Sequence, residues 1–235
     1  MEVIKLTRRL SRAVNRLTFD EPVTHVYNPL QYARVTFEQY LERFAHQGVE
    51  AMFLGMNPGP FGMAQTGVPF GEINVVRDWM GIDGPVKRPS KQHPKRPIDG
   101  FDCTRSEVSG RRLWGWAQNR FDSAEAFFER FFVWNFCPLL FMEATGRNRT
   151  PDKLPARERE PLYQVCDRSL IEMVQALKPR MIIGVGKFAE SRARKVLGDA
   201  LPIASILHPS PASPAANRGW EEQAHSQLRE LGIHP

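Results

Sequence analysis

Four short apolar segments, separated from one another by sequence of helical character, constrain the fold of this chain more than any other feature. They are Ala51–Met56, Phe131–Phe136, Met181–Val185 and Ile203–Leu207. Each is almost continuously apolar, which is typical of a strand that is covered on both faces. The intervening helical patterns are the crossovers that parallel strands require. The sequence therefore predicts an α/β fold, a three-layer α/β/α sandwich with a central four-stranded parallel sheet.

Helices are predicted in the connections between these strands. Thr36 is a candidate N-cap for a helix that Gly48 would end, and Pro161 is expected to open a longer helix. Three further segments carry apolar residues at helical spacing: Leu113–Phe121, Phe188–Leu197 and Trp220–Leu231.

The first 25 residues carry apolar side chains at helical spacing between Val3 and Leu17. We expect a helical extension that packs on a single domain spanning residues 1–235. No apolar run reaches the roughly 18 residues of a membrane helix, so we expect no association with a membrane. The expected location is a bacterial cytoplasm, or the nucleus if the source is a eukaryote.

The basic composition favours a polyanionic partner. Lys and Arg number 32 against 26 Asp and Glu, which gives a formal net charge of +6. The segment Pro85–Pro97 concentrates part of this charge and contains no acidic residue. Two interpretations of it stay open, a loop that contacts phosphates and a solvated loop. The three cysteines are far apart and form no closely spaced pair, so we expect no metal site.

The residues at the end of each predicted strand are the first candidates for a functional site, because ligands of parallel α/β sheets bind at the carboxyl ends of the strands. Asn57, Asn135 and His208 stand at three of these ends, and none of the four ends carries Asp or Glu. Two carboxamides and one imidazole suit a neutral, amide-like heterocycle. They also suit a reaction whose transition state develops its own charge, such as the loss of a nucleobase from deoxyribose.

Each of these residues also has a purely structural interpretation. Asn57 precedes a proline and suits a turn, Asn135 suits a loop cap, and His208 suits a satisfied, half-buried histidine. The segment GVGK (Gly184–Lys187) lacks the spacing of a P-loop and is more typical of a close strand–helix turn. Two alternatives therefore stay open: a phosphate-binding enzyme of the doubly wound type that uses GVGK, and a non-catalytic protein that binds damaged DNA.

Two long motifs are more specific than any of these single residues. Gly55–Glu72 reads GMNPGPFGMAQTGVPFGE and is followed by VRDWMGI (Val76–Ile82), and His208–Trp220 reads HPSPASPAANRGW. They resemble the first and second motifs of the single-strand selective monofunctional uracil-DNA glycosylases. The segments Trp134–Pro155 and Gly184–Arg194 also resemble this family, and the similarity extends from about Val26 to the C-terminus.

This resemblance implies the fold of the uracil-DNA glycosylase superfamily, a four-stranded parallel sheet between helices. It implies an enzyme that flips uracil, 5-hydroxymethyluracil or related oxidised or deaminated bases out of single- or double-stranded DNA. The enzyme would hydrolyse the N-glycosidic bond and leave an abasic site, without lyase chemistry. It would act as a monomer and use neither a metal nor a cofactor.

The resemblance also implies roles for the motif residues. Asn57 would hold the attacking water, and His208 would donate to uracil O2 and stabilise the leaving anion. Asn135 would pair with the O4 and N3–H edge of the flipped base. Phe70 would stack on the uracil ring, and Met56 would line the pocket. The backbone N–H groups of Gly59 and Met63 would hold a water beside C5 of the base.

The loop Pro209–Ala216 would wedge into the duplex while the base is flipped out. Animal members of the family have Arg at the wedge position, where this chain has Ala212. A weaker wedge is therefore expected, with Arg218 as a candidate substitute. The residues expected to contact DNA are Pro209, Ser210, Pro211, Ala212, Ser213, Arg218, Lys187, Lys87, Arg88 and Lys91.

Overall fold

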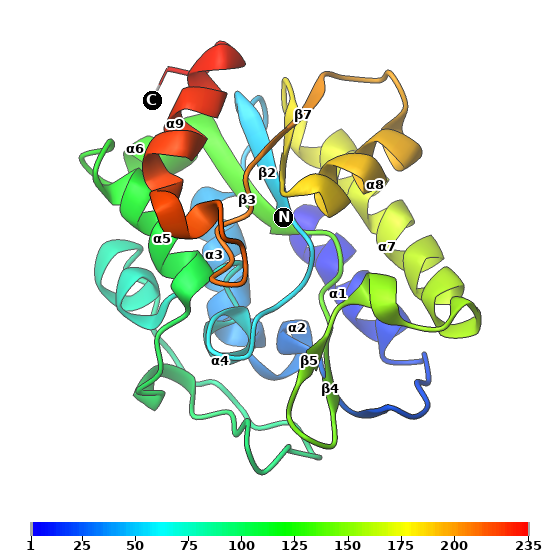
Figure 1. Cartoon of the computed structure of the whole chain (residues 1–235). Coiled ribbons are helices and arrows are strands. Elements are labelled where there is room, and N and C mark those ends of the chain that lie inside the picture. The colour runs from blue at the N-terminus through cyan, green and yellow to red at the C-terminus, as the bar shows by residue number, and fades with distance from the viewer. Residues whose placement is uncertain (1, 235) are drawn as a thin grey trace.

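The four predicted strands form one parallel sheet in the computed structural model, which describes residues 2–234 (Figure 1). Its order is β3-β2-β6-β7, with β2 at Ala51–Gly55, β3 at Phe131–Asn135, β6 at Ile182–Val185 and β7 at Ile203–Ile206. All residues of β2, β3 and β6 are buried, as their continuous apolar runs predict. The register pairs Gly55 with Asn135, so β2 and β3 end side by side.

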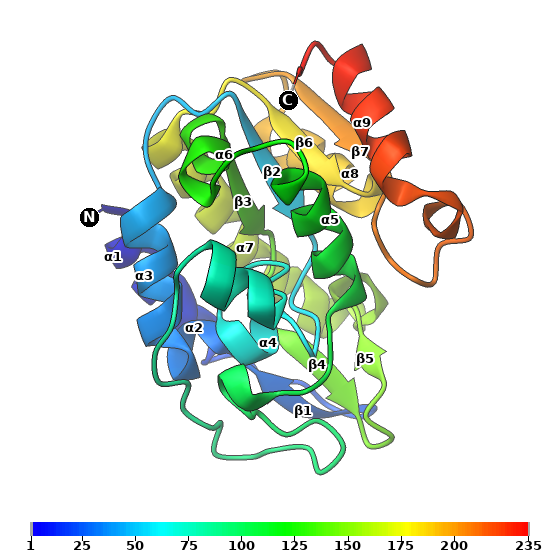
Figure 2. The same cartoon turned by 90° about the vertical axis from the view of Figure 1, so that its left-hand side faces the viewer.

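Helices cover both faces of the sheet (Figures 1 and 2), and the predicted three-layer sandwich is confirmed. One face carries α5 (Val108–Gln118), α6 (Ala124–Arg130) and α9 (Trp220–Glu230), and the other carries α7 (Ala156–Leu177) and α8 (Lys187–Leu197). The N-terminal helix α1 (Glu2–Val14) packs against α7. Its buried apolar side chains belong to the same hydrophobic core as the sheet.

Aromatic side chains hold two of these helices on the sheet. The ring centroid of Phe53 in β2 lies 6.2 Å from that of Trp116 in α5 and 6.4 Å from that of Phe127 in α6. Phe127 also lies 5.3 Å from Phe131 of β3, centroid to centroid. Because each large aromatic side chain buries a large area, this cluster fixes the sheet firmly against the helices that approach the site.

Helix α3 (Arg34–Phe44) differs from its predicted limits. It begins two residues before Thr36, so the prediction of Thr36 as N-cap is wrong, and it ends four residues before Gly48. The Thr36 side chain is buried within the helix, and its hydroxyl donates to the carbonyl of Thr66 over 2.6 Å. Thr36 therefore serves a tertiary contact, which helix-cap preferences do not reveal.

The longest helix, α7, begins at Ala156, and the prediction that Pro161 opens it is wrong. Pro161 lies in the second turn, where it removes the hydrogen bond to the carbonyl of Arg157. Both residues are exposed, so solvent can satisfy that carbonyl. Within residues 2–234, neither α7 nor any other helix is long and apolar enough to cross a bilayer.

A second, antiparallel sheet was not predicted from the sequence. Its order is β1-β4-β5, with β1 at Val23–Tyr27, β4 at Leu140–Glu143 and β5 at Asn148–Arg149. It lies beyond the carboxyl ends of the parallel strands, next to the short helices α2 (Pro29–Tyr32) and α4 (Met63–Thr66) (Figures 1 and 2). This sheet and the irregular segment 57–106 together build the walls around the end of the parallel sheet.

Candidate active site

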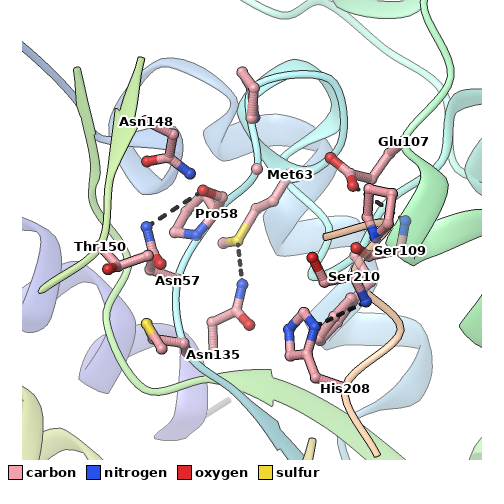
Figure 3. Close-up of a pocket in the computed structure, with 15 residues that line it drawn as sticks. Asn57, Pro58, Met63, Glu107, Ser109, Asn135, Asn148, Thr150, His208 and Ser210 are labelled. Carbon is pink, nitrogen blue, oxygen red and sulfur yellow. Dashed lines mark hydrogen bonds between the residues drawn. The ribbon is translucent and has the colours of Figure 1, made fainter. Parts of the chain in front are cut away.

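Residues from widely separated segments meet in one cavity at the carboxyl ends of the parallel strands (Figure 3). Its volume is about 380 Å³, within the roughly 300–1,000 Å³ of small-molecule sites. The residues singled out from the sequence that line it are Met56, Asn57, Gly59, Met63, Phe70, Asn135, His208, Ser210 and Pro211. It is also lined by Pro58, Pro60, Glu107, Ser109, Asn148 and Thr150, which were not expected to be site residues.

Asn135, the last residue of β3, presents a carboxamide with an unused acceptor. Its Nδ2 lies 3.3 Å from the sulfur of Met63, whereas its buried Oδ1 has no hydrogen-bond partner among the described residues. The neighbouring Gly55 makes room for this group, because a Cβ there would collide with Asn135 Oδ1 and lie 2.6 Å from the Phe70 ring. A buried acceptor without a partner is costly, so the site is suited to a ligand that donates an N–H to Oδ1.

Asn57 follows β2 and is oriented by its own amide nitrogen. Nδ2 lies 3.2 Å from the carbonyl oxygen of Leu139. It also lies 3.4 Å from that of Pro58, and this contact is drawn in Figure 3. Because the nitrogen is held by these acceptors, Oδ1 is left as the acceptor of the side chain. The Asn57 carboxamide is thereby suited to accept a hydrogen bond from a water molecule.

His208 follows β7, and its tautomer is set by the backbone. The N–H of Ser210 donates to Nδ1 over 3.0 Å (Figure 3), so the proton of the neutral imidazole is on Nε2. Burial lowers the pKa of His208 from its ordinary value of 6.5 to about 4. His208 is thus a neutral Nε2–H donor at physiological pH.

This pKa predicts a stability change at acid pH. Below pH 6.5 the unfolded chain binds a proton at His208 that the folded protein excludes down to about pH 4, so stability decreases as the pH falls through that window. Between pH 7 and pH 5 we expect the wild type to lose about 2 kcal/mol more unfolding free energy than a His208→Gln variant. Urea unfolding of both proteins across this range measures the difference, and parallel pH profiles would contradict it.

The glycine-rich turn after β6 makes room for His208. Gly186 has a φ of +91°, and a Cβ on it would lie 3.0 Å from the Cβ of His208. Lys187 points elsewhere, with Nζ 2.8 Å from Glu190 Oε2 and 3.1 Å from Ser205 Oγ. GVGK is therefore a close strand–helix turn that admits the imidazole.

Phe70 is held in a strained backbone conformation beside the cavity. It has a φ of +54°, unusual for a residue other than glycine, and its carbonyl accepts a hydrogen bond of 3.1 Å from Trp114 Nε1. A Cβ on Gly110 would collide with the same carbonyl. The Phe70 ring lies 6.3 Å from the His208 ring, centroid to centroid. Strain of this kind persists only where the surroundings enforce it, which is common at ligand sites.

The loop after His208 is anchored by a residue that was not singled out from the sequence. Arg112, on α5, donates from Nη1 to the carbonyl of Pro209 over 3.0 Å and from Nη2 to Oδ1 of Asn217 over 2.8 Å. Ser210 and Pro211 of this loop line the cavity, and Pro209, Ala212 and Ser213 belong to the same segment. Arg218, at the far end of the loop, is exposed. Arg112 thus connects both ends of the loop to the body of the protein.

The other expected DNA contacts lie outside this cavity. Lys87, Arg88 and Lys91 line a separate groove that also includes residues of α1 and α2, and Lys91 Nζ donates to the carbonyl of Thr24 over 2.9 Å. Within residues 2–234, no three His, Cys, Asp or Glu side chains are grouped as a metal site would require. Cys103, Cys137 and Cys166 are free thiols.

Comparison with known families gives one match that covers most of the chain. The model of the uracil DNA glycosylase superfamily matches residues 43–229. The single-strand selective monofunctional uracil DNA glycosylase of Mus musculus is 50% identical over 230 residues, which are 97% of this chain and 82% of the relative. The protein of the same name from Bos taurus is 51% identical over 230 residues, 97% of this chain and 85% of the relative.

A solved structure with a much lower sequence identity has the same architecture. The crystal structure of wild-type Pedobacter heparinus SMUG2 superposes with a TM-score of 0.64 at 17% sequence identity. The superposition covers 97% of this chain and 98% of that chain. At this level of identity the likeness concerns the fold, including the layers that carry the cavity.

Proposed function

Because this chain belongs to the single-strand selective monofunctional uracil-DNA glycosylases, within the uracil-DNA glycosylase superfamily, we infer that it excises uracil from DNA and leaves an abasic site. DNA is accordingly its macromolecular substrate. The observation that carries the proposal is the meeting of Asn57, Asn135 and His208 around one cavity of small-molecule size. None of the three is charged at neutral pH, which suits a neutral base.

The reaction separates charge, and the three side chains match that separation. As the N-glycosidic bond breaks, positive charge develops on the deoxyribose and negative charge on the departing uracil. His208 donates from Nε2 to O2 of uracil, where part of the negative charge collects. Asn57 accepts from a water molecule at Oδ1 and directs it at the anomeric carbon. The electron pair of the broken bond leaves with uracil, and the water oxygen bonds to the anomeric carbon. The water releases one proton to the solvent, and the abasic sugar results.

The base is recognised along its Watson–Crick edge. Asn135 donates from Nδ2 to O4 and accepts from N3–H at Oδ1, the atom that is otherwise buried without a partner. Phe70 stacks on the ring, and Met56 lines the pocket. The N–H groups of Gly59 and Met63, which have no partner among the described residues, lie beside C5. They can donate to an oxygen on a 5-hydroxymethyl group but not to the methyl group of thymine.

In the proposal some of the DNA-binding residues lie beside this cavity and others lie outside it. The loop Pro209–Ala216 supports the gap that the flipped base leaves, with Arg218 as a cationic neighbour. Lys87, Arg88, Lys91 and Lys187 contact phosphates. The enzyme acts as a monomer and requires neither a metal nor a cofactor.

The activity is tested with an oligonucleotide that contains one uracil, in buffer with EDTA, followed by alkali. Alkali-dependent cleavage at the uracil is expected on single- and double-stranded substrates. The same preparation of an Asn57→Ala, His208→Leu double variant controls for contaminating glycosylases. DNA binding without an abasic product would favour a non-catalytic damage binder, and activity that needs Mg²⁺ and a free nucleotide would favour the phosphate-binding alternative.

Loss of Arg112, which anchors the loop after His208, is expected to weaken DNA binding more than it lowers the rate of the chemical step. In Arg112→Met the loop loses its hydrogen bonds to Arg112 and must be ordered when DNA binds. We expect the half-saturating DNA concentration to rise about tenfold, with a smaller change in the maximal single-turnover rate. The matched control is Arg111→Met, an exposed neighbour on the same helix. Unchanged affinity in Arg112→Met would remove the anchoring role.

A further inference from the structure

The cavity contains one carboxyl group that the excision of uracil does not use. Glu107 lies just before α5, where Oε1 accepts a hydrogen bond of 3.2 Å from the N–H of Ser109. No hydrogen bond to Oε2 and no ion pair with Glu107 is found among the described residues. Figure 3 shows the Glu107 side chain at the cavity, near Ser109. One carboxylate oxygen is thus committed to the helix cap, and the other is available.

Two glycines of the first motif make room for this carboxyl group. A Cβ on Gly59 would collide with Oε2 and lie 3.2 Å from Cδ of Glu107. A Cβ on Gly62 would lie 2.8 Å from Cγ of the same side chain. Glu107 therefore lies directly against the backbone segment that carries the N–H groups of Gly59 and Met63.

A carboxyl group at this position is unfavourable for the step that all substrates share. Negative charge develops on the departing base, and a nearby carboxylate repels it. Burial also raises the pKa of Glu107, against the opposing effects of hydrogen bonding from the backbone and from the side chain of Ser109. The cap hydrogen bond from the N–H of Ser109 uses Oε1, so a donor on the base would give Oε2 a favourable partner of its own.

We propose that Glu107 is a specificity-determining residue that accepts, at Oε2, a hydrogen bond from a donor carried at C5 of the flipped pyrimidine. This inference rests on the proposed function and on the placing of C5 beside Gly59 and Met63. A 5-hydroxymethyl group fits the combination, because its oxygen accepts from the backbone N–H groups while its hydroxyl donates to Glu107. Uracil carries no substituent at C5 and makes no hydrogen bond with Oε2. A methyl group offers neither interaction.

The variant Glu107→Gln changes the chemistry at a single atom. The N–H of Ser109 needs an acceptor, so the side-chain oxygen of Gln remains there and its NH₂ group takes the place of Oε2. The acceptor that faces C5 thereby becomes a donor. A 5-formyl group, which only accepts, is then favoured, and a 5-hydroxymethyl group loses its acceptor.

The test compares single-turnover rates on uracil, 5-hydroxymethyluracil and 5-formyluracil in otherwise identical oligonucleotides. In Glu107→Gln we expect excision of 5-hydroxymethyluracil to fall about ten- to hundredfold relative to uracil, and the ratio of 5-formyluracil to 5-hydroxymethyluracil to rise. Glu107→Ala should excise 5-hydroxymethyluracil more slowly than the wild type, without faster excision of 5-formyluracil. The control is Glu129→Gln, an exposed carboxylate on α6, which should match the wild type.

The outcomes separate this proposal from the function on which it rests. A wild type that releases no uracil overturns the proposed function itself. A wild type that releases uracil, together with Glu107→Gln ratios equal to those of the wild type, overturns the role of Glu107. Equal losses on all three bases, with or without a lower unfolding temperature, also overturn it, because they indicate a role in the helix cap alone.

Discussion

Replacing His208 by leucine is expected to lower the single-turnover rate of uracil release by about 10²–10³, the loss typical of one donor to a developing anion. Leucine fills the same space but cannot donate to O2 of the leaving base. Binding to DNA that contains an abasic site should be retained, because no leaving group is present there. Rapid-quench kinetics and a fluorescence binding titration measure the two quantities.

The His208→Leu result is informative because the imidazole is neutral. With its pKa lowered to about 4, His208 acts through a fixed Nε2–H dipole, and the wild-type rate should not follow a titration near pH 6.5. His208→Gln, which keeps an N–H donor, should recover part of the rate. Equal loss of rate and of abasic-site binding in His208→Leu would instead indicate that the side chain is needed for folding.

Replacing Asn57 by alanine is expected to lower the single-turnover rate about 10²–10³-fold, with little effect on affinity for uracil-containing DNA. The variant loses the acceptor that orients the water but leaves the base contacts in place. The measurement is the rate at saturating enzyme together with the half-saturating concentration. The matched control is Asn148→Ala, which removes another carboxamide from the same cavity and should cost less than tenfold.

The prediction for Asn57 also depends on the orientation of its carboxamide group. Because Nδ2 is held by the carbonyl oxygens of Leu139 and Pro58, Oδ1 cannot exchange places with Nδ2 without losing those bonds. A larger loss of affinity than of rate in Asn57→Ala would contradict the positioning of water and would make Asn57 a base-binding residue.

The sequence predicted the parallel sheet well because burial on both faces produces continuous apolar runs. Where a segment is exposed on one side or is very short, that signal disappears: β5 has two residues, and β1 is mostly half-buried. Helix limits were predicted less well. Thr36 and Pro161 carry strong local preferences, but a tertiary hydrogen bond and an exposed turn override them.

The residues of the candidate site likewise divide into those that the sequence could predict and those that it could not. Asn57, Asn135 and His208 could be proposed from the sequence because each stands at a strand end, where chain order implies spatial proximity. Glu107 and Arg112 come from the start and the interior of a helix, where an acidic or basic residue usually indicates only a cap or a solvated face. Their contacts with Gly59 and with the loop after His208 depend on tertiary packing, which single-sequence patterns do not encode.

The unpaired oxygen of Asn135 has a consequence for turnover. Its partner is the N3–H of uracil, and that group is present in the free base as well as in the nucleotide. The hydrogen bond between Asn135 and N3–H therefore stabilises the complex with free uracil as well as the complex with the uracil nucleotide. We therefore expect product release, of the free base or of the abasic strand that covers the opening, to limit the catalytic cycle. Added free uracil should act as a competitive inhibitor.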